Sequence, residues 1–184
     1  MQIIVKDIPA EGLELDVDSG GTPWFLQVLK DALGEAYAKQ SKGEGRLTLL
    51  RTGENVDCEG KISCDYYPIC SRCLKVFPSH LDISIHLTLA PLYESERQLK
   101  LEQKEEVELV KEDLEFAYYD NGRFDLGETI REQIILGLPM QLICRASCKG
   151  LCALCGKDLN EGPCQCKAGQ ADTRWAPLKA LKRS

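Results

Sequence analysis

Residues 144–166 have the sequence CRASCKGLCALCGKDLNEGPCQC, and this stretch decides how the C-terminal part of the chain folds. Its six cysteines are spaced as C-x3-C, C-x2-C and C-x-C, which is more typical of metal half-sites than of disulfides. A closed tetrahedral site takes four sulfur ligands, so six cysteines are too many for one site and too few for two. Either two ligands come from elsewhere in the chain, or two thiols are spare.

The second half of this stretch contains the ligands of one complete site. Cys152 and Cys155 form a C-x2-C pair, in which a tight turn aims both sulfur atoms at one ion. Gly156 lets the backbone turn back sharply after the pair. A Gly-Pro turn separates the pair from Cys164 and Cys166. The sequence therefore predicts that these four cysteines close one tetrahedral site locally.

Cys144 and Cys148 remain as a half-site that needs a partner. The other C-x2-C pair of the chain is Cys70 and Cys73, in the segment ICSRCLKVF at residues 69–77. Joining the two pairs gives a second site and closes a loop of roughly 70 residues, which removes entropy from the unfolded chain. Two structural zinc ions, each with four cysteine ligands, are then predicted.

A competing assignment joins the two C-x2-C pairs, 70/73 with 152/155, and leaves 144/148 with 164/166. We favour the first assignment, because local closure of residues 152–166 costs less chain entropy.

The N-terminal half alternates between strand and helix patterns. Residues 2–8 and 12–17 are rich in β-branched residues or alternate in polarity, which predicts two short strands. Thr22 and Pro23 are typical of the N-cap and first residue of a helix. Apolar residues then recur at helical spacing, so an amphipathic helix is expected to end near residues 39–45.

Three longer strands follow. Residues 46–51 and 56–67 flank a turn at 53–55, and Cys58 and Cys64 lie on one face of the second strand, where small buried thiols are expected. Strict alternation predicts that residues 81–92 form a strand with one apolar face. That face carries Leu81, Ile83, Ile85, Leu87 and Leu89.

The last elements before the cysteine-rich stretch are a hairpin and a helix. Residues 114–120 and 123–126 flank Asn121-Gly122, which is typical of a hairpin turn. Asp125 is a candidate cap for a helix that Pro139 ends. The apolar residues Leu126, Ile130, Ile134 and Leu138 recur along this helix at a spacing of four.

These patterns predict an α+β fold. Its core is expected to be a mostly antiparallel, barrel-like sheet with two main helices, to which a cysteine-rich zinc-binding module is attached. We place the core domain at residues 1–143, with a charged loop at 92–113. Residues 144–184 are assigned to the zinc-binding module and a basic tail, packed on the core.

Charge is unevenly distributed along the chain. The net charge of −6 argues against a protein that coats nucleic acid with its whole surface. Residues 144–184, however, contain eight Lys and Arg residues against three Asp and Glu residues. The sequence shows neither a signal-peptide pattern nor an apolar run of roughly 18 residues, so we expect a cytoplasmic protein without a membrane partner.

The histidines, the glutamates of the last helix and the C-x2-C cysteines are residue types that often act in catalysis. Here they are better explained by structural roles or by exposure to solvent. His80 and His86 lie beside or opposite the apolar face of their predicted strand, where solvent exposure is expected. Glu128 and Glu132 share a helix face without a general acid or base nearby in the sequence. Neither C-x2-C pair clearly opens a helix, which disfavours thiol redox chemistry. We therefore expect a protein that is not an enzyme.

Four motifs together resemble the bacterial YceD family, a metal-binding domain also called the large ribosomal RNA subunit accumulation protein. They are CSRCL at 70–74, a helix running into LGLP at 136–139, the pattern C-x3-CKGLC-x2-CG-x2-LN-x3-C-x-C from Cys144, and D-x-RWAPLKAL at 172–181. The resemblance implies a non-catalytic ribosome-biogenesis factor that supports synthesis, processing or stability of large-subunit ribosomal RNA. It carries over no catalytic residue. The positions that it implies as metal ligands are Cys70, Cys73, Cys144, Cys148, Cys152, Cys155, Cys164 and Cys166.

The expected partner is ribosomal RNA or a ribosomal or assembly protein, and no small-molecule substrate is expected. Basic residues around the predicted sites are the candidate contacts. These are Arg72, Lys149, Lys157, Lys167, Arg174, Lys179, Lys182 and Arg183. Trp175, Leu178 and Leu181 are at least as well explained as residues that dock the tail on the protein.

Two alternative functions stay open. One is a zinc-stabilised adaptor that binds only protein, for which the acidic segment 94–113 is the candidate surface. The other, which we favour less, is a thiol oxidoreductase that uses Cys70 and Cys73 or Cys152 and Cys155.

Overall fold

The computed structural model describes residues 1–92 and 116–166, which form two compact units. The first unit consists of Met1–Pro68 and Phe77–Met140. The second consists of Ile69–Val76 and the chain from Gln141 onward. Residues 69–76, which the sequence-based division places in the core domain, thus belong to the second unit, because their cysteines lie among those of residues 144–148.

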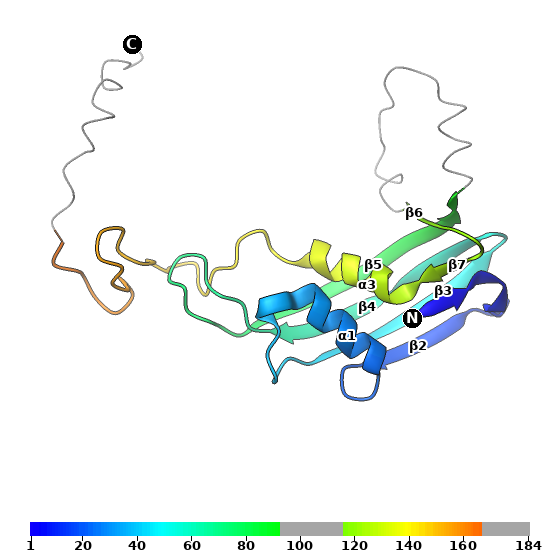
Figure 1. Ribbon diagram of the computed structural model, residues 1–184, viewed down its shortest axis with the longest axis horizontal. Helices are drawn as coiled ribbons and strands as arrows, with labels where there is room; N and C mark the ends of the chain where they lie inside the picture. The colour runs from blue at the N-terminus through cyan, green and yellow to red at the C-terminus, as the bar shows by residue number, and fades with distance from the viewer. Residues whose placement is uncertain (93–115, 167–184) are drawn as a thin grey trace, which may run out of the picture. The chain divides into compact units, whose positions relative to one another are not determined.

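The first unit is built on a five-stranded sheet with the strand order β2-β3-β4-β5-β6 (Figure 1). Its pairs are antiparallel except β5–β6, which is parallel. This confirms the predicted α+β class with a mostly antiparallel sheet. The core is not barrel-like, however, because β2 and β6 remain as edges of an open sheet among the described strands. The strands are β2 (Leu13–Asp18), β3 (Gly43–Thr52), β4 (Asn55–Tyr66), β5 (Ser79–Pro91) and β6 (Phe116–Tyr119).

Strand β5 has the two faces that its alternating sequence predicts. The five apolar side chains from Leu81 to Leu89 are buried, and the residues between them face away from the core. Cys58 and Cys64 of β4 pair with Leu87 and Leu81 on this buried face. The two thiols are 0% and 2% exposed, so the prediction that they are core residues is confirmed.

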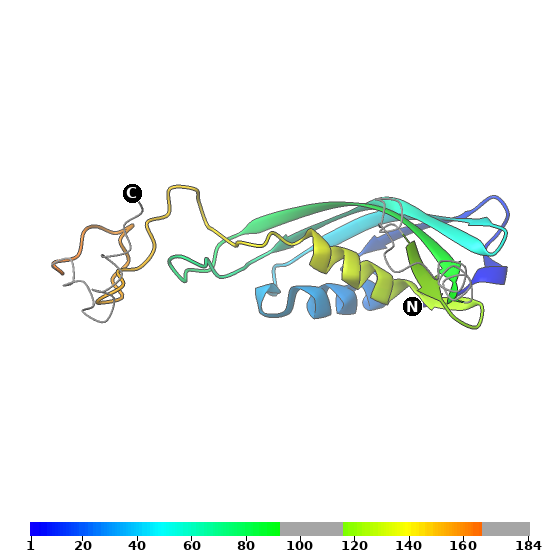
Figure 2. The ribbon, with the colours of Figure 1, turned by 90° about the horizontal axis from the view of Figure 1, so that it is seen from above.

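Helices α1 (Pro23–Leu33) and α3 (Leu126–Gly137) cover one face of the sheet, as Figure 2 shows. They pack against each other, and α3 also packs on β5. Their apolar stripes explain this arrangement, because Phe25, Leu29, Ile130 and Ile134 are fully buried between the helices and the sheet. On the opposite face of β2–β5, the outward side chains are mostly exposed among the described residues.

The helix ends differ in two respects from the prediction. Asp125 caps α3 as expected, since its Oδ1 accepts the N–H of Glu128 at 3.1 Å. Thr22 precedes α1, but its side chain accepts the N–H of Asp18 instead of capping the helix. Helix α1 ends at Leu33, earlier than predicted, because Gly34 leaves the helical conformation with a φ of 51°. A 3-10 turn, η2 (Gly34–Ala36), follows.

The predicted hairpin turn at Asn121-Gly122 is present and is closed by an antiparallel bridge between Asp120 and Arg123, but beyond this bridge the two strands pair with other partners. Strand β6 pairs with β5, whereas β7 (Arg123–Asp125) pairs antiparallel with β1 (Gln2–Ile4) in a separate two-stranded sheet. A parallel pair needs a long connection, and the chain between Pro91 and Phe116 has the necessary length. After β1 the chain forms a 3-10 turn, η1 (Val5–Asp7), where the sequence predicts continued strand.

Some predictions fall outside the described residues. The charged segment 94–113 lies there, as does the basic tail after residue 166 with Trp175, Leu178 and Leu181. Within the described ranges, no helix has the length and apolar character that crossing a membrane requires.

Candidate metal centres

Both C-x2-C motifs form the same type of tight turn, which we call a knuckle. In the first knuckle (residues 69–76), the N–H of Cys70 donates to the carbonyl oxygen of Lys75 at 2.9 Å. In the second (residues 151–158), the N–H of Cys152 donates to the carbonyl oxygen of Lys157 at 2.8 Å. One β-bridge closes each knuckle at its base, Ile69 with Val76 and Leu151 with Asp158. Neither motif opens a helix, so neither has the environment of a thioredoxin-like redox site.

The first cluster combines the first knuckle with the C-x3-C pair. The sulfur atoms of Cys70, Cys73, Cys144 and Cys148 all lie within 4.8 Å of one another. The Sγ atoms of Cys70 and Cys148 are 3.9 Å apart, and those of Cys73 and Cys144 are 3.8 Å apart. Four sulfurs placed tetrahedrally at about 2.3 Å from a zinc ion are separated by about 3.8 Å. These two pairs therefore fit a zinc ion of this type, and no disulfide links any of the four.

The second cluster is formed locally by Cys152, Cys155, Cys164 and Cys166, again with all sulfur atoms within 4.8 Å of one another. The Sγ atoms of Cys152 and Cys164 are 3.4 Å apart, slightly closer than an ideal tetrahedral edge. Cys155 and Cys166 are exposed, whereas three of the four cysteines of the first cluster are buried. The sulfur atoms thus gather in the pairing that we favoured from chain entropy, and not in the competing one.

Backbone hydrogen bonds favour the thiolate form of cysteines in both clusters. The N–H of Cys144 donates to Sγ of Cys70 at 3.4 Å, and this bond is the main cause that lowers the pKa of Cys70 to about 6. In the second cluster, the N–H groups of Leu154 and Cys155 lower the pKa of Cys152 to about 6. Such donors are typical partners of metal-bound sulfur.

Other thiols of the same clusters resist ionisation. Burial and the neighbouring thiols Cys148 and Cys70 raise the pKa of Cys144 to about 12. In the second cluster, Cys155 and then burial raise the pKa of Cys166 to about 12. Sulfurs this close cannot all carry a negative charge unless a positive charge lies among them. A divalent cation supplies that charge, so the donor sets fit a metal ion chemically as well as geometrically.

The segment that contains Cys144 and Cys148 is held on the first knuckle by several hydrogen bonds. Both the N–H and the hydroxyl of Ser71 donate to the carbonyl oxygen of Leu142, at 2.8 and 3.0 Å. The Arg72 guanidinium donates to the carbonyl oxygen of Cys148 at 3.1 Å. In return, the N–H of Leu151 donates to the backbone carbonyl oxygen of Arg72 at 3.0 Å. The two half-sites therefore meet through backbone contacts as well as through their cysteines.

The predicted contact residues are only partly within the described structure. Arg72, Lys149 and Lys157 are exposed in the second unit. The other five lie outside the described residues; they are Lys167, Arg174, Lys179, Lys182 and Arg183.

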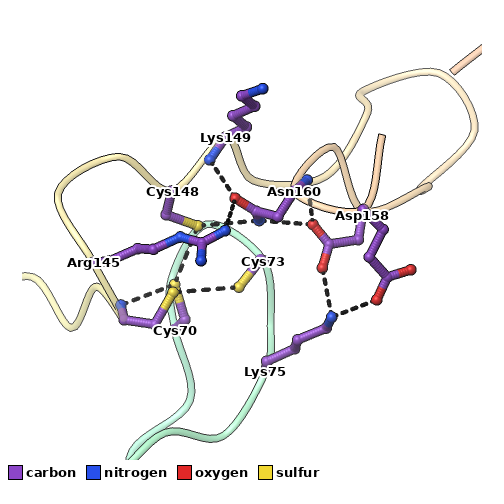
Figure 3. Close-up of polar contacts among 10 residues, drawn as sticks. Cys70, Cys73, Lys75, Arg145, Cys148, Lys149, Asp158 and Asn160 are labelled. Carbon is purple, nitrogen blue, oxygen red and sulfur yellow. Dashed lines mark hydrogen bonds and ion pairs between the residues drawn. The ribbon is translucent and has the colours of Figure 1, made fainter. Parts of the chain in front are cut away.

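The sequence reasoning missed several polar residues that surround the first cluster. Figure 3 shows Lys75, Arg145, Asp158 and Asn160 linked to one another and to the cysteines by hydrogen bonds and ion pairs. The ion pair with Lys75 is the main cause that lowers the pKa of Asp158 to about 2. These residues surround the cysteines but are not themselves the metal ligands. Rules that search the sequence for the spacing of ligands therefore do not find them.

The histidines and helix glutamates are found where the sequence places them. His80 and His86 are exposed on β5 and lie beside carboxylates, of which Asp65 and Glu59 are 2.7 and 3.2 Å away. Glu128 is exposed and paired with Arg131 at 2.6 Å, and Glu132 is also exposed. None of the four lies in a cysteine cluster.

The fold and the clusters together define a class: an α+β protein with an open sheet, whose second unit gathers eight cysteines into two sets suited to divalent metal ions. Sequence comparison gives the particular family. The family model described as "Large ribosomal RNA subunit accumulation protein YceD" matches residues 58–182, which is more than half of the chain. The chain therefore belongs to the YceD family, and the resemblance noted from its motifs is confirmed.

The individual relatives that match this chain have low sequence identity to it. A chloroplastic protein of Arabidopsis thaliana, named large ribosomal RNA subunit accumulation protein YCED homolog 1, is 34% identical over 58 residues. That match covers 32% of this chain and 18% of the relative. An uncharacterized protein of Mycobacterium leprae is 24% identical over 178 residues, covering 97% of this chain and 68% of the relative. An uncharacterized protein of Mycobacterium tuberculosis is 29% identical over 132 residues, covering 72% and 58%. No solved structure matches this chain.

Proposed function

We propose that this chain is a non-catalytic factor that supports the synthesis, processing or stability of large-subunit ribosomal RNA in the cytoplasm. Its membership of a family named for the accumulation of that RNA is the observation that carries the proposal. The two cysteine clusters support a structural rather than a catalytic metal, because four protein sulfurs leave no open position for water or substrate.

Zinc is the metal that we propose for both clusters. Tetrahedral sets of four thiolates select zinc or iron among the common metals, and closed knuckles with this spacing are typical of structural zinc. The eight cysteines of the two clusters would hold two ions, and the ions would supply folding free energy to a unit whose described residues contain no regular helix or long strand.

We propose that the second unit is the part of the protein that contacts RNA or an assembly protein. Arg72, Lys149 and Lys157 contribute exposed positive charge there, and five further basic residues follow in the sequence. A zinc ion with four thiolates carries a net charge of about −2, so RNA contact depends on these side chains rather than on the metal.

The open face of the sheet favours a second candidate, a protein adaptor. Its charged outward side chains are mostly acidic, which repels the phosphates of RNA and suits a basic protein. Only two basic residues, Arg46 and Lys61, accompany them on β3 and β4. The acidic residues are Glu14, Asp16, Asp18, Glu44, Asp57, Glu59, Asp65 and Asp82.

Depletion and complementation test the proposal. Loss of the protein is expected to lower the amount of large-subunit ribosomal RNA relative to small-subunit RNA, and the wild-type gene is expected to restore it. Cys70→Ser with Cys73→Ser is expected not to restore it, whereas Cys58→Ala, a cysteine outside both clusters, is the matched control. Unchanged RNA ratios after depletion would contradict the proposal.

Purified protein separates the two candidates. Binding to large-subunit ribosomal RNA fragments that weakens steeply with salt supports RNA contact, provided that Lys149→Ala with Lys157→Ala makes the binding both weaker and less dependent on salt. Absence of RNA binding, together with capture of a basic assembly protein that is lost after Asp16→Asn with Asp82→Asn, supports the adaptor.

A further inference from the structure

Asn160 lies in the loop of the second cluster, but its side chain contacts the first cluster (Figure 3). Its Nδ2 donates to Sγ of Cys148 at 3.5 Å, and its Oδ1 accepts the backbone N–H of Lys149 at 2.9 Å. One amide thus holds both a ligand sulfur and the peptide group that follows it. The same Oδ1 accepts the guanidinium of Arg145 at 3.0 Å, one residue after Cys144.

The orientation of this amide is set by Asp158 of the same loop. Oδ1 of Asp158 accepts both the backbone N–H and the Nδ2 of Asn160, at 2.8 and 2.7 Å. Both residues lie between Cys155 and Cys164, so their positions depend on how the loop between these two cysteines is folded. Because an Asn amide has a donor end and an acceptor end, this anchoring aims its donor at the sulfur and its acceptor at the peptide N–H.

The loop also contacts the other half of the first cluster. Lys75 follows Cys73 by two residues, and its Nζ lies 2.8 Å from Oδ2 of Asp158 and 2.6 Å from Oε1 of Glu161. The loop of the second cluster therefore contacts both chain segments that supply cysteines to the first. All these contacts are within the second unit.

We propose that Asn160 is a positioning residue that couples the two clusters, so that a metal ion in the second cluster raises the affinity of the first cluster for its own ion. This inference rests on the metal-binding part of the proposed function and not on RNA binding.

Conformational entropy explains how the coupling works. Ordering a loop costs backbone entropy, and an ion held by Cys152, Cys155, Cys164 and Cys166 offsets that cost. Once the loop is ordered, the first cluster gains the Asn160 hydrogen bonds with little further ordering. Coupling is reciprocal, so an ion in the first cluster strengthens binding at the second by the same factor.

A double-mutant cycle of four full-length proteins tests the coupling. In each protein, the zinc affinity of the first cluster is measured by competition with a chelator of known affinity. The chains are the wild type, Asn160→Ala, Cys155→Ser with Cys166→Ser, and the triple variant. Disabling the second cluster is expected to weaken the first about ten-fold or more, and Asn160→Ala to do nearly the same. In the triple variant the two effects are expected not to add, because they break one link.

Gln165→Ala is the matched control, since it removes an exposed amide from the same cluster, between Cys164 and Cys166. It is expected to leave both affinities unchanged. The affinity of the second cluster is read in a chain whose first cluster is disabled by Cys70→Ser with Cys73→Ser. There, Asn160→Ala is expected to change zinc affinity less than about three-fold, because Asn160 is not a ligand of the second cluster.

Three results would overturn the coupling: equal affinity of the first cluster with and without the second, additive effects in the triple variant, or, in the chain whose first cluster is disabled, a loss at the second cluster after Asn160→Ala as large as the loss seen at the first. The last result would mean that the residue only folds the loop. Two ions that bind independently overturn this inference alone and leave the proposed function intact. A chain that binds no zinc overturns the metal part of both.

Discussion

Leu74 and Gly156 occupy the same position in the two knuckles, directly after the second cysteine of each C-x2-C pair, and both have positive φ angles of 58° and 71°. This backbone conformation closes each knuckle, because the N–H of each residue donates at 2.9 Å to the carbonyl oxygen of the first cysteine of its pair. Glycine adopts it freely, whereas a residue with a Cβ pays about 1–2 kcal/mol.

We therefore expect Leu74→Gly to stabilise the second unit and Gly156→Ala to destabilise it by about 1 kcal/mol. Leu74 is 63% exposed, so removing its side chain gives up little buried surface. The greater freedom of glycine in the unfolded chain offsets part of the gain, which keeps the stabilisation at or below about 1 kcal/mol. Cobalt-loaded protein, unfolded in denaturant and followed by its sulfur-to-cobalt absorption, reports on this unit. The same direction of change in both variants would contradict the expectation.

Gly150→Ala is expected to damage the first cluster more than Gly156→Ala damages the second. Gly150 has nearly the same φ, 70°, but a Cβ there would lie 2.9 Å from the carbonyl oxygen of Arg72, which accepts the N–H of Leu151. The variant therefore adds a backbone clash to the conformational cost, and we expect a loss of about 2 kcal/mol or more.

The measurement is zinc affinity by chelator competition, together with denaturant unfolding. Gly156→Ala is the matched control, because a Cβ there meets open space. If both glycine variants lost equal stability, the close approach of residue 150 to Arg72 would have no energetic consequence.

Thiol alkylation is expected to divide the ten cysteines into two groups. Metal binding protects the eight cluster cysteines, and a chelator makes them reactive, starting in the second cluster, where Cys155 is exposed. Burial raises the pKa of Cys58 and of Cys64 to about 11, so at neutral pH almost none of either is thiolate. Mass spectrometry at neutral pH is expected to find eight labels after chelation and ten only after unfolding. Early labelling of Cys58 or Cys64 would contradict their place in the core.

His80 is expected to make stability depend on pH. Hydrogen bonding to Asp65, and then to Asp82, raises the pKa of His80 above its usual 6.5. The stabilisation is therefore fully present below pH 6.5 and is lost as the pH rises through the higher pKa of the folded protein. Exposed pairs of this kind contribute less than about 1 kcal/mol, and salt weakens them.

Comparing wild type with His80→Gln in denaturant from pH 5.5 to 8.5 measures this effect. The wild type is expected to lose stability relative to the variant across that range, and a histidine NMR titration is expected to give a pKa above 6.5 for His80. His86→Gln is the matched control on the same strand. A difference between wild type and His80→Gln that is independent of pH would refute the role of the imidazolium.

Several features of the fold were predictable because they depend on short-range patterns. Alternation in residues 81–92 predicted the buried face of β5, and apolar residues at helical spacing predicted the packing faces of α1 and α3. The Asn121-Gly122 turn, closed by the bridge between Asp120 and Arg123, was also predictable, but the partners of its two strands beyond that bridge were not. Strand β6 joins β5 and β7 joins β1, and a turn motif contains no information about such distant partners.

The sequence by itself determined the α+β class, the local closure of the second cluster and the family, because these follow from periodicity, from spacing within about fifteen residues and from recurring motifs. Only the tertiary structure decided which half-site meets the first knuckle: Cys148 lies 3.9 Å from Cys70, although 78 positions separate them. It also showed that Asn160 reaches from one cluster to the other. The first contact depends on how distant segments pack, and the second on how the loop between Cys155 and Cys164 folds back on Cys148; residue spacing alone specifies neither.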